Sequence, residues 1–364
     1  MKRRVVVAMS GGVDSSVAAA LLKEQGYDVI GVTMQIWTSN RNAPEDERFG
    51  GCCSISAVED ARMVAEKLDI PYYVLNFREI FAEKVMRNFV EEYLAGRTPN
   101  PCVRCNQFVK FEVLLQKAMG LGADYIATGH YARIEQSAET GRFVLRKGLD
   151  PRKDQSYALY TMTQQQLART LMPVGGLCKD ETRAIARKYE LVTHQKEESQ
   201  DICFVTDNDY GRFLEEEAGV TSTPGLIVDI SGKTVGTHRG LVHYTIGQRR
   251  GLGVAAGNRI YVTDIDIASN TLVVGPKEAA FRQELTVREP SWIAFDTLKK
   301  RLSLKAKIRY NMQEMACNAE PREEGGVHVR FDEPQWAVCP GQSIVFYDGD
   351  MVVGGGLIDN QVEG

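Results

Sequence analysis

The stretch Ser10-Gly11-Gly12-Val13-Asp14-Ser15 decides the fold of this chain, because it directly follows the apolar run Val5-Val6-Val7-Ala8-Met9. The run predicts a buried strand, and an apolar-striped segment from Ser16 to about Gln25 predicts a helix behind the turn. The two glycines let backbone N–H groups point inward without an obstructing Cβ, and the serine hydroxyls add donors. The helix N-terminus contributes the positive end of its dipole, so the turn predicts a polyphosphate site.

The turn lacks the Lys-Ser/Thr pair of a Walker A loop, which disfavours the GTPases and kinases that use that loop. Its SGGxDS pattern resembles the PP-loop of ATP pyrophosphatases, which split ATP into AMP and pyrophosphate and adenylylate an oxygen. The resemblance implies that ATP is bound by Ala8, Met9, Ser10, Gly11, Gly12, Val13, Asp14 and Ser15. Magnesium would neutralise the pyrophosphate, and Asp14 is the nearest candidate ligand.

The composition is that of a soluble globular protein: 364 residues, 43% apolar and 25% charged. This length predicts two or three domains. No stretch approaches the ~18–20 apolar residues of a membrane span, and the apolar run after the basic N-terminus is too short for a signal peptide. We therefore expect a cytoplasmic protein with no membrane partner, whose eight cysteines are reduced thiols.

Two basic stretches stand out against a net charge of −4. Residues 237–263 contain four arginines and no acid, and residues 297–310 contain six basic residues and no acid. Basic patches on an acidic protein suit one specific polyanion better than bulk nucleic acid. A solvated charged face is the alternative for each stretch.

Strands and helices alternate over the first two hundred residues, which predicts an α/β fold with a parallel sheet and ligands at the carboxyl ends of its strands. Short period-two runs after about residue 210 predict antiparallel β structure, and those after about residue 285 a small closed barrel. We expect a PP-loop catalytic domain (1–208), similar to adenine nucleotide α-hydrolases, a small β-rich central domain (209–282) and a C-terminal β-barrel (283–364).

The cysteines that could carry chemistry are Cys102 and Cys105, a CxxC pair expected between two helices, and the distant Cys203. Cys105 lies near the start of the helix expected at 108–119, where the dipole and the Arg104 guanidinium would lower a thiol pKa. The three cysteines fit a dithiol that exchanges sulfur, a three-cysteine ligand set, or coincidence. Structural zinc would need a fourth ligand, and none is evident. The vicinal pair Cys52-Cys53 suggests no chemistry.

Seven motifs in order cover nearly the whole chain: SGGVDS, GRTPNPCVRCN, ATGHYA, KDQSY, SQDICFV, HYTIGQRRGLG and KIRY. Together they resemble the tRNA 2-thiouridylases, ATP-dependent sulfurtransferases that replace the 2-oxygen of the wobble uridine with sulfur. The resemblance implies tRNA with a wobble uridine as substrate, bound partly by the central domain. The sulfur donor would be a cysteine desulfurase or a sulfur-relay protein. Adenylylation turns the uracil oxygen, a poor leaving group, into one that departs as AMP.

The resemblance implies that Cys203 carries the sulfur as a persulfide, and that Cys105 attacks it to leave a Cys105–Cys203 disulfide. The best-studied members have an aspartate where this chain has Cys102, proposed there as an acid or base. Cys102, Cys105 and Cys203 could instead ligate a [4Fe–4S] cluster with one iron open to sulfide. Both routes stay open at this point.

Other roles carry over position by position. Met34 would lie against the adenine and Gly129 near the nucleotide. The target base, flipped out of the anticodon loop, would border Asn100, Pro101 and Cys102. The tRNA contacts implied are His130, Lys153, Asp154, Gln155, Arg309, Tyr310 and Gln342.

Two other functions compete with this interpretation. Another PP-loop ATP pyrophosphatase, such as an amide- or amine-forming ligase, would need no thiols, so Cys105 and Cys203 argue against it. A tRNA-binding module with a vestigial nucleotide fold is disfavoured by the intact SGGVDS.

Overall fold

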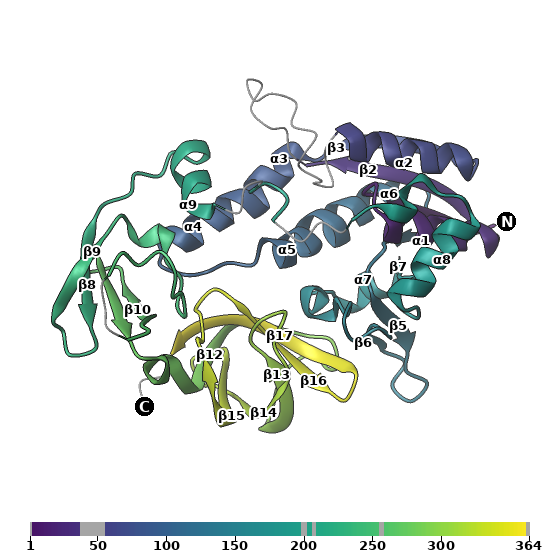
Figure 1. Ribbon diagram of the computed structural model, residues 1–364. Helices are drawn as coiled ribbons and strands as arrows, with labels where there is room; N and C mark the ends of the chain where they lie inside the picture. Colours follow the sequence, from purple (N-terminus) through teal and green to yellow (C-terminus); the bar gives the residue numbers. More distant parts are fainter. Residues whose placement is uncertain (1, 37–54, 198–201, 206–208, 255–257, 362–364) are drawn as a thin grey trace. The chain divides into compact units, whose positions relative to one another are not determined.

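The computed structural model (Figure 1) describes residues 2–36, 55–197, 202–205, 209–254 and 258–361. The pair Cys52-Cys53 and residues Ser199, Gln200 and Asp201 of the SQDICFV motif lie outside the described residues. By its internal contacts the chain forms two compact units. The first contains residues 1–86, 101–208 and 349–352, and the second contains residues 87–100, 209–348 and 353–364. The division into domains 1–208, 209–282 and 283–364 stays a prediction.

A parallel sheet of order β3-β2-β1-β4-β7 forms the centre of the first unit. Its strands are β1 (Arg4–Ala8), β2 (Asp28–Gln35), β3 (Tyr72–Asn76), β4 (Tyr125–Ala127) and β7 (Thr170–Leu171). Strand β1 lies between β2 and β4, in parallel register with both. Its residues Val5 and Val7 are fully buried, as expected for a strand covered on both sides. The predicted parallel α/β domain is confirmed.

Helices join these strands, and the loop between β1 and α1 sits at the carboxyl end of the central strand. The helices around the sheet are α1 (Val13–Glu24), α2 (Ile55–Lys67), α3 (Arg78–Phe81), α6 (Leu115–Gly120), α7 (Gln164–Ala168) and α8 (Lys179–Lys188). Helix α8 packs against α1, which brings residues more than 150 positions apart in sequence to the same loop. The helix expected at 164–171 ends at Ala168, and Thr170–Leu171 adds the edge strand β7 instead.

The CxxC pair lies inside a helix, not before one. Helix α5 (Pro101–Arg104) continues as the π-helix η2 (Cys105–Leu114) and then as α6. Pro101 explains the early start, because proline is favoured at the first helical position, where its missing N–H costs nothing. A hairpin of β5 (Ala132–Gln136) and β6 (Phe143–Lys147), which the sequence did not predict, pairs through Arg146 with Met351.

The second unit contains a small sheet of order β10-β11-β8-β9. Its strands are β8 (Gly225–Asp229), β9 (Thr234–His238), β10 (Tyr261–Asp266) and β11 (Thr271–Gly275). The expectation of antiparallel pairing holds for β8–β9 and β10–β11, but β8 and β11 run parallel. Ile227, Val262 and Leu272 are fully buried and form the core of this sheet.

A closed barrel follows, with strand order β12-β15-β14-β13-β16-β17 and a final pairing of β12 with β17. The strands are β12 (Phe281–Trp292), β13 (Leu302–Lys307), β14 (Met315–Pro321), β15 (Val327–Trp336), β16 (Ser343–Asp348) and β17 (Met351–Gln361). Alternate residues such as Leu285, Val329 and Phe346 point inward and are fully buried. The predicted C-terminal barrel is confirmed.

Helix α4 (Arg87–Leu94) belongs to the second unit although it continues α3 through the π-helix η1 (Ala82–Met86). Its Phe89 packs edge-on against Phe213, with ring centroids 5.9 Å apart. The remaining short elements are α9 (Tyr210–Arg212), η3 (Ser156–Leu159), η4 (Val192–Gln195), η5 (Phe213–Glu217), η6 (Leu241–His243) and η7 (Lys277–Ala280). Across the described ranges, no helix is both long and apolar enough to cross a membrane.

Candidate active site

The loop after β1 has the geometry that an anion-binding turn requires. Gly11 has a φ of +67°, and a Cβ there would collide with the carbonyl of Ala57. Gly12 caps α1 in an extended conformation, and its carbonyl accepts hydrogen bonds from the hydroxyls of Ser15 (3.2 Å) and Ser16 (2.8 Å). The first N–H groups of α1 have no partner within the helix and are available to an anion.

Neighbouring strands hold this loop in place. The Thr33 hydroxyl donates to the carbonyl of Met9 at 2.7 Å, and the Tyr72 hydroxyl donates to Thr33. Met34 follows on the same strand, half-buried near the end of β2. Gly129 follows β4 and lies against α1: a Cβ there would be 2.6 Å from the Asp14 carbonyl carbon and the Ser15 nitrogen. The predicted nucleotide residues Met34 and Gly129 therefore follow the two strands that flank β1.

Asp14, in the first turn of α1, is surrounded by polar groups from two other elements. The Lys179 ammonium lies 2.8 Å from Asp14 Oδ1 and 2.9 Å from Oδ2. The Tyr131 hydroxyl donates to Oδ1 at 2.7 Å and lies 3.0 Å from the Thr182 hydroxyl. The Lys179 side chain is only 7% exposed and that of Asp14 29%, so this ion pair is shielded from water.

Lys179, Tyr131 and Thr182 are site residues that sequence reasoning missed. One signal was present: Lys179 is the first residue of α8, where a positive charge opposes the helix dipole. A cation at that unfavourable position indicates a nearby anion. The helix start is fixed by Glu181, which accepts the Cys178 N–H at 2.7 Å, and by Asp150, which accepts the Lys179 N–H at 3.2 Å.

The CxxC thiols are presented from successive turns of one helical segment. Cys102 is exposed and Cys105 half-buried. Residues three apart in a helix lie on the same side, so the two sulfurs share a face. Arg104 stacks over the Phe108 ring at 4.5 Å, and the Asn106 amide donates to the carbonyl of Ala158 at 2.9 Å.

Cys203 is half-buried, and the following Phe204 anchors it by packing edge-on against Phe81 of α3. The three cysteines proposed as cluster ligands do not converge as a metal site in this conformation. Nor does any other group of three His, Cys, Asp or Glu side chains within the described part of the chain.

His130 lies beside the CxxC helix. Its Nδ1 is 2.8 Å from the Thr128 hydroxyl, and its ring centroid is 5.9 Å from that of Phe111. Burial lowers the pKa of His130 well below 6.5, and the nearby charge of Lys110 lowers it further. The imidazole is therefore neutral at pH 7.

Two residues of the KDQSY motif organise the backbone. Asp154 is buried and accepts hydrogen bonds from the N–H groups of Gly148 (3.0 Å) and Ser156 (3.1 Å). The Gln155 carbonyl oxygen accepts the Tyr131 N–H at 2.9 Å, so Gln155 positions the tyrosine that holds Asp14. Lys153, the other predicted tRNA contact in this motif, is half-buried.

In the second unit, Gln342 holds the segment that leads into the CxxC helix. Its side-chain amide donates to the carbonyl oxygens of Thr98 (2.9 Å) and Pro99 (3.3 Å). The Thr98 N–H in turn donates to the carbonyl of Pro340 at 2.8 Å. Asn100, the next residue but one, is half-buried, and Pro101 is buried.

Arg309 makes internal contacts within the second unit. Its Nη2 donates to the carbonyls of Ile246 (3.2 Å) and Ala337 (2.8 Å) and lies 2.8 Å from the Cys339 sulfur. It therefore connects the segment after η6 to the end of β15. Tyr310 beside it is 41% exposed, which leaves its ring accessible to a base.

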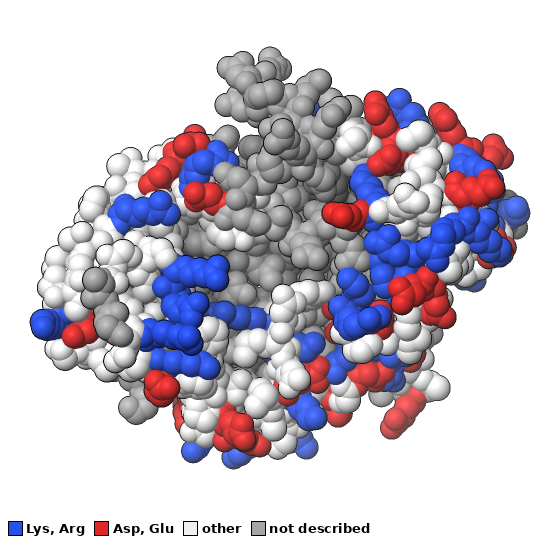
Figure 2. Space-filling model, in the orientation of Figure 1, with Lys and Arg blue, Asp and Glu red and all other residues white. Residues whose placement is uncertain are grey.

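The two basic stretches differ in how their charges are used. Arg239, Arg249, Arg250 and Arg259 are all exposed. In the other stretch, Arg301 and Lys307 face acidic partners, Glu320 at 3.3 Å and Glu314 at 3.8 Å. Figure 2 shows a gathering of basic side chains on the second unit near β10, and a separate band on the first unit beside α8.

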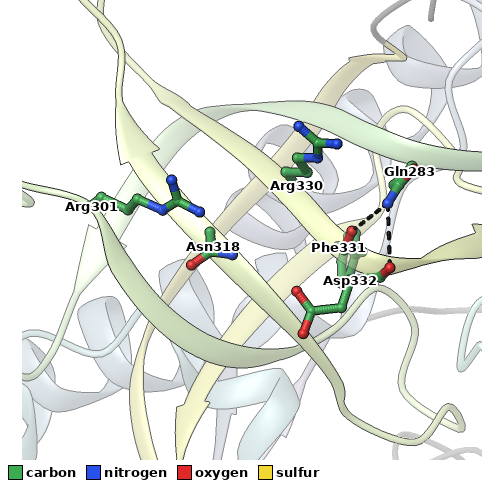
Figure 3. A pocket seen from close by; sticks show the side chains of 6 residues that line it. All are labelled: Gln283, Arg301, Asn318, Arg330, Phe331 and Asp332. Atoms are coloured by element: carbon green, nitrogen blue, oxygen red, sulfur yellow. Dashed lines mark hydrogen bonds between the residues drawn. The ribbon is translucent and has the colours of Figure 1, made fainter.

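A shallow pocket on the barrel is lined by Gln283, Arg301, Asn318, Arg330, Phe331 and Asp332. Figure 3 shows the Gln283 amide bridging the carbonyls of Phe331 and Asp332. Arg301 pairs with Glu320 and Arg330 with Glu284, so acids offset both arginines. The pocket contains none of the predicted site residues.

The fold and the loop define the class of the protein: a parallel α/β nucleotide-binding domain of the HUP type followed by two β modules. Residues 3–207 match the family model "tRNA methyl transferase HUP domain". Residues 211–276 match "tRNA methyl transferase PRC-barrel domain", and residues 282–358 match "Aminomethyltransferase beta-barrel domain".

Full-length relatives identify the family. The chain is 54% identical over 359 residues to the tRNA-specific 2-thiouridylase MnmA of Clostridium perfringens, covering 99% of each chain. The protein of that name from Acetivibrio thermocellus is also 54% identical, over 98% of this chain and 99% of the relative. The chain belongs to the tRNA-specific 2-thiouridylase MnmA family. The family resemblance is thus confirmed, and membership supports ATP binding by the first unit.

Proposed function

We propose that this protein is an ATP-dependent tRNA 2-thiouridylase, which adenylylates O2 of a wobble uridine and replaces that oxygen with sulfur. The observation that carries the proposal is the intact phosphate loop, with Asp14 at its helix start and Gly129 packed against it. The tRNA substrate is the one named for its relatives, at 54% identity over the full chain. This substrate places the reaction in the cytoplasm. We also propose the three-domain division at residues 208 and 282.

The first half-reaction activates the base. The uridine O2 attacks the α-phosphorus of ATP, the bond to the β-phosphate oxygen breaks, and pyrophosphate leaves. The N–H groups of the loop and the first turn of α1 face the negative charge that moves onto the pyrophosphate. Asp14 fits a magnesium site, because its carboxylate is a hard oxygen ligand beside the phosphate loop. Bound magnesium would neutralise the pyrophosphate there.

The second half-reaction transfers sulfur, for which we propose Cys203 and Cys105. The terminal sulfur of a Cys203 persulfide attacks C2, and AMP leaves. The Cys105 thiolate then attacks the Cys203 sulfur, the bond from Cys203 to the transferred sulfur breaks, and that sulfur keeps the electron pair as thiouridine. A thiol reductant must reduce the resulting disulfide before the next turnover.

Two features support this assignment. Cys105 is on a π-helix, a form that is frequent at functional sites, and its sulfur shares a helical face with the exposed Cys102. Cys203 is followed by a buried aromatic anchor, Phe204. A cluster-bound sulfide is the second candidate route, because the chain offers Cys102 as a third thiol. In that route Cys102, Cys105 and Cys203 would hold a [4Fe–4S] cluster.

Substrate RNA would be held by several groups. The exposed arginines of residues 239–259 offer charge to the tRNA backbone without acidic neighbours in that stretch. Tyr310 would stack on a base, and Asn100, Pro101 and Cys102 would border the flipped uridine. Neutral His130 and half-buried Lys153 are the proposed tRNA contacts of the first unit.

The test is a thiolation assay with anaerobically purified protein, unmodified tRNA, ATP–magnesium, and either sulfide or a persulfide donor. Wild type is compared with Cys203→Ala, Cys105→Ala and Cys102→Ala, with iron measured in each preparation. Cys317→Ala is the thiol control, because burial raises the pKa of that barrel cysteine to about 12.

The persulfide route predicts iron-free activity that Cys203→Ala and Cys105→Ala abolish and Cys102→Ala spares. Loss of both iron and sulfide-dependent activity in all three variants establishes the cluster route instead. Formation of AMP with a small amine substrate, and unchanged activity in Cys203→Ala, would indicate a ligase that uses no thiols. Absence of thiolated tRNA with either donor would overturn the proposed function.

A further inference from the structure

Lys179 has a position that the proposed chemistry does not yet use. Its ammonium contacts both carboxylate oxygens of Asp14 and lies 5.5 Å from the centre of the Tyr131 ring. Because Asp14 is the second residue of α1, this ammonium is adjacent to the loop N–H groups that would bind phosphate. A side chain only 7% exposed cannot rely on water to stabilise its charge, so it needs an anion close by.

From this geometry we infer that Lys179 is a further phosphate-binding residue of the site. It neutralises Asp14 in the nucleotide-free protein and contacts the β- and γ-phosphates when ATP is bound. The inference rests on the proposed ATP chemistry and adds to it a binding group for the pyrophosphate that leaves.

The charges around Asp14 support this exchange. One carboxylate balances one ammonium in the structure described here. If Asp14 also becomes a magnesium ligand, two cations share a single carboxylate, and the shielded ammonium loses part of its counter-charge. The phosphates arrive together with the magnesium and are the anions that restore the balance. Phosphate oxygens are also the acceptors with which an ammonium forms its stronger hydrogen bonds.

The surroundings allow the ammonium to shift while the carboxylate stays. Tyr131 holds Asp14 from the other side, and Gln155 fixes the backbone of Tyr131. The start of α8 is fixed by the contacts of Glu181 and Asp150. Lys179 therefore has a rigid backbone and a flexible four-carbon side chain, which suits a charge that moves a short distance between two anions.

The test measures nucleotide binding by titration calorimetry in metal-free buffer, with no catalytic step. The probes are an ATP analogue with a methylene group between the α- and β-phosphorus, which is not cleaved at that position, and AMP, which lacks the β- and γ-phosphates. Wild type is compared with Lys179→Met, Asp14→Asn and the double variant. Methionine keeps most of the apolar volume of the buried lysine stem. Lys196→Met is the matched control, because Lys196 forms a similarly shielded ion pair with Asp60 of α2.

We expect Lys179→Met to weaken binding of the analogue by roughly ten- to a hundredfold, the range of a lost charged hydrogen bond, and to leave AMP binding unchanged. The loss should persist in the Asp14→Asn background. If it disappears there, Lys179 only neutralises Asp14, and the inference is wrong. Equal losses for the analogue and AMP would also overturn it, because they would indicate a damaged loop.

Two further measurements separate the possible failures. Thermal unfolding of each variant checks that the first unit is intact, and Lys179→Arg, which keeps the charge, should retain most of the affinity for the analogue. If wild-type protein does not bind the analogue even with magnesium present, the proposed function itself fails. If wild type binds and Lys179→Met binds equally well, only the role of Lys179 is rejected.

Discussion

Gln342 donates a hydrogen bond of 2.9 Å to the carbonyl oxygen of Thr98, two residues before the helix start that carries Cys102 begins at Pro101. The barrel strand end thus fixes the backbone that leads into the CxxC helix. We expect Gln342→Ala to lower kcat by about ten- to a hundredfold and to leave ATP binding unchanged, because misplacement of a reacting group costs rate more than affinity.

Gln283→Ala is the matched control, because Gln283 also donates to two backbone carbonyls, but within the barrel (Figure 3). Steady-state kinetics with tRNA as the varied substrate distinguishes the alternatives. A rise in KM for tRNA with unchanged kcat would instead indicate the direct tRNA contact that the family resemblance implies for Gln342.

Gly129 packs against the start of α1 so closely that a methyl group would force Asp14 and Ser15 to move. Gly129→Ala should therefore weaken ATP binding by roughly tenfold or more, since the loop N–H groups would no longer converge on the phosphates. Gly120→Ala at the end of α6 is the control, because a Cβ there meets nothing within 4 Å. Equal nucleotide affinity in the two variants would contradict this prediction.

Arg309 connects two segments of the second unit through Ile246 and Ala337. Arg309→Ala should lower the free energy of unfolding by about 2–4 kcal/mol, because buried carbonyls lose a charged donor. The exposed Lys305 of β13 is the control, whose replacement by alanine should change stability by less than about 0.5 kcal/mol. A salt-titrated tRNA binding curve with a slope reduced by about one, without loss of stability, would support a phosphate contact by Arg309 instead.

His130 should make stability fall as the pH decreases below about 6.5. Burial, with the charge of Lys110, lowers the pKa of His130 in the folded protein. Between the folded and unfolded pKa values, the unfolded state binds a proton that the folded state does not. The contribution is therefore complete above pH 6.5 and is lost as the pH falls. His130→Gln should flatten the dependence of urea unfolding between pH 7 and pH 5, and parallel curves would refute this.

Glu92 of α4 pairs with Arg97 at 2.7 Å and with Arg288 of β12 at 3.0 Å. Burial raises the pKa of Glu92, but the two guanidinium groups outweigh it and hold the pKa below 4.5. Arg288→Met should cost about 3 kcal/mol in chemical denaturation, because it leaves a buried carboxylate with one partner fewer. Arg322→Met removes an exposed pair with Glu324 and should cost less than about 1 kcal/mol. Similar losses in both would show that the Glu92 pairs add little.

The parallel sheet, the phosphate loop and the barrel could be predicted because each depends on a local pattern. The run from Val5 to Met9 followed by SGGVDS specifies a strand, a turn and a helix within about twenty residues. The start of the CxxC helix at Pro101 was harder to predict. The π-helix Cys105–Leu114 has a wider turn than an α-helix, so its apolar residues do not follow the usual helical spacing.

The pairing of Lys179 with Asp14 could not be read from the sequence, because the two residues are 165 positions apart and meet only when α8 packs on α1. Asp154 and Gln342 show a related difficulty. A motif indicates that a polar side chain matters, but only the structure shows that these two bind backbone groups of the protein itself.

Residues 87–100 belong to the second compact unit although they interrupt the first in the sequence, and their Phe89 contacts Phe213 and Tyr210. A single cut in the polypeptide therefore cannot yield two intact halves. A fragment beginning near residue 209 would lack α4 and leave aromatic core residues uncovered. The consequence is evolutionary as well as practical: recombination cannot exchange the second unit as one continuous piece of gene. The nucleotide-binding and barrel parts are expected to be inherited together.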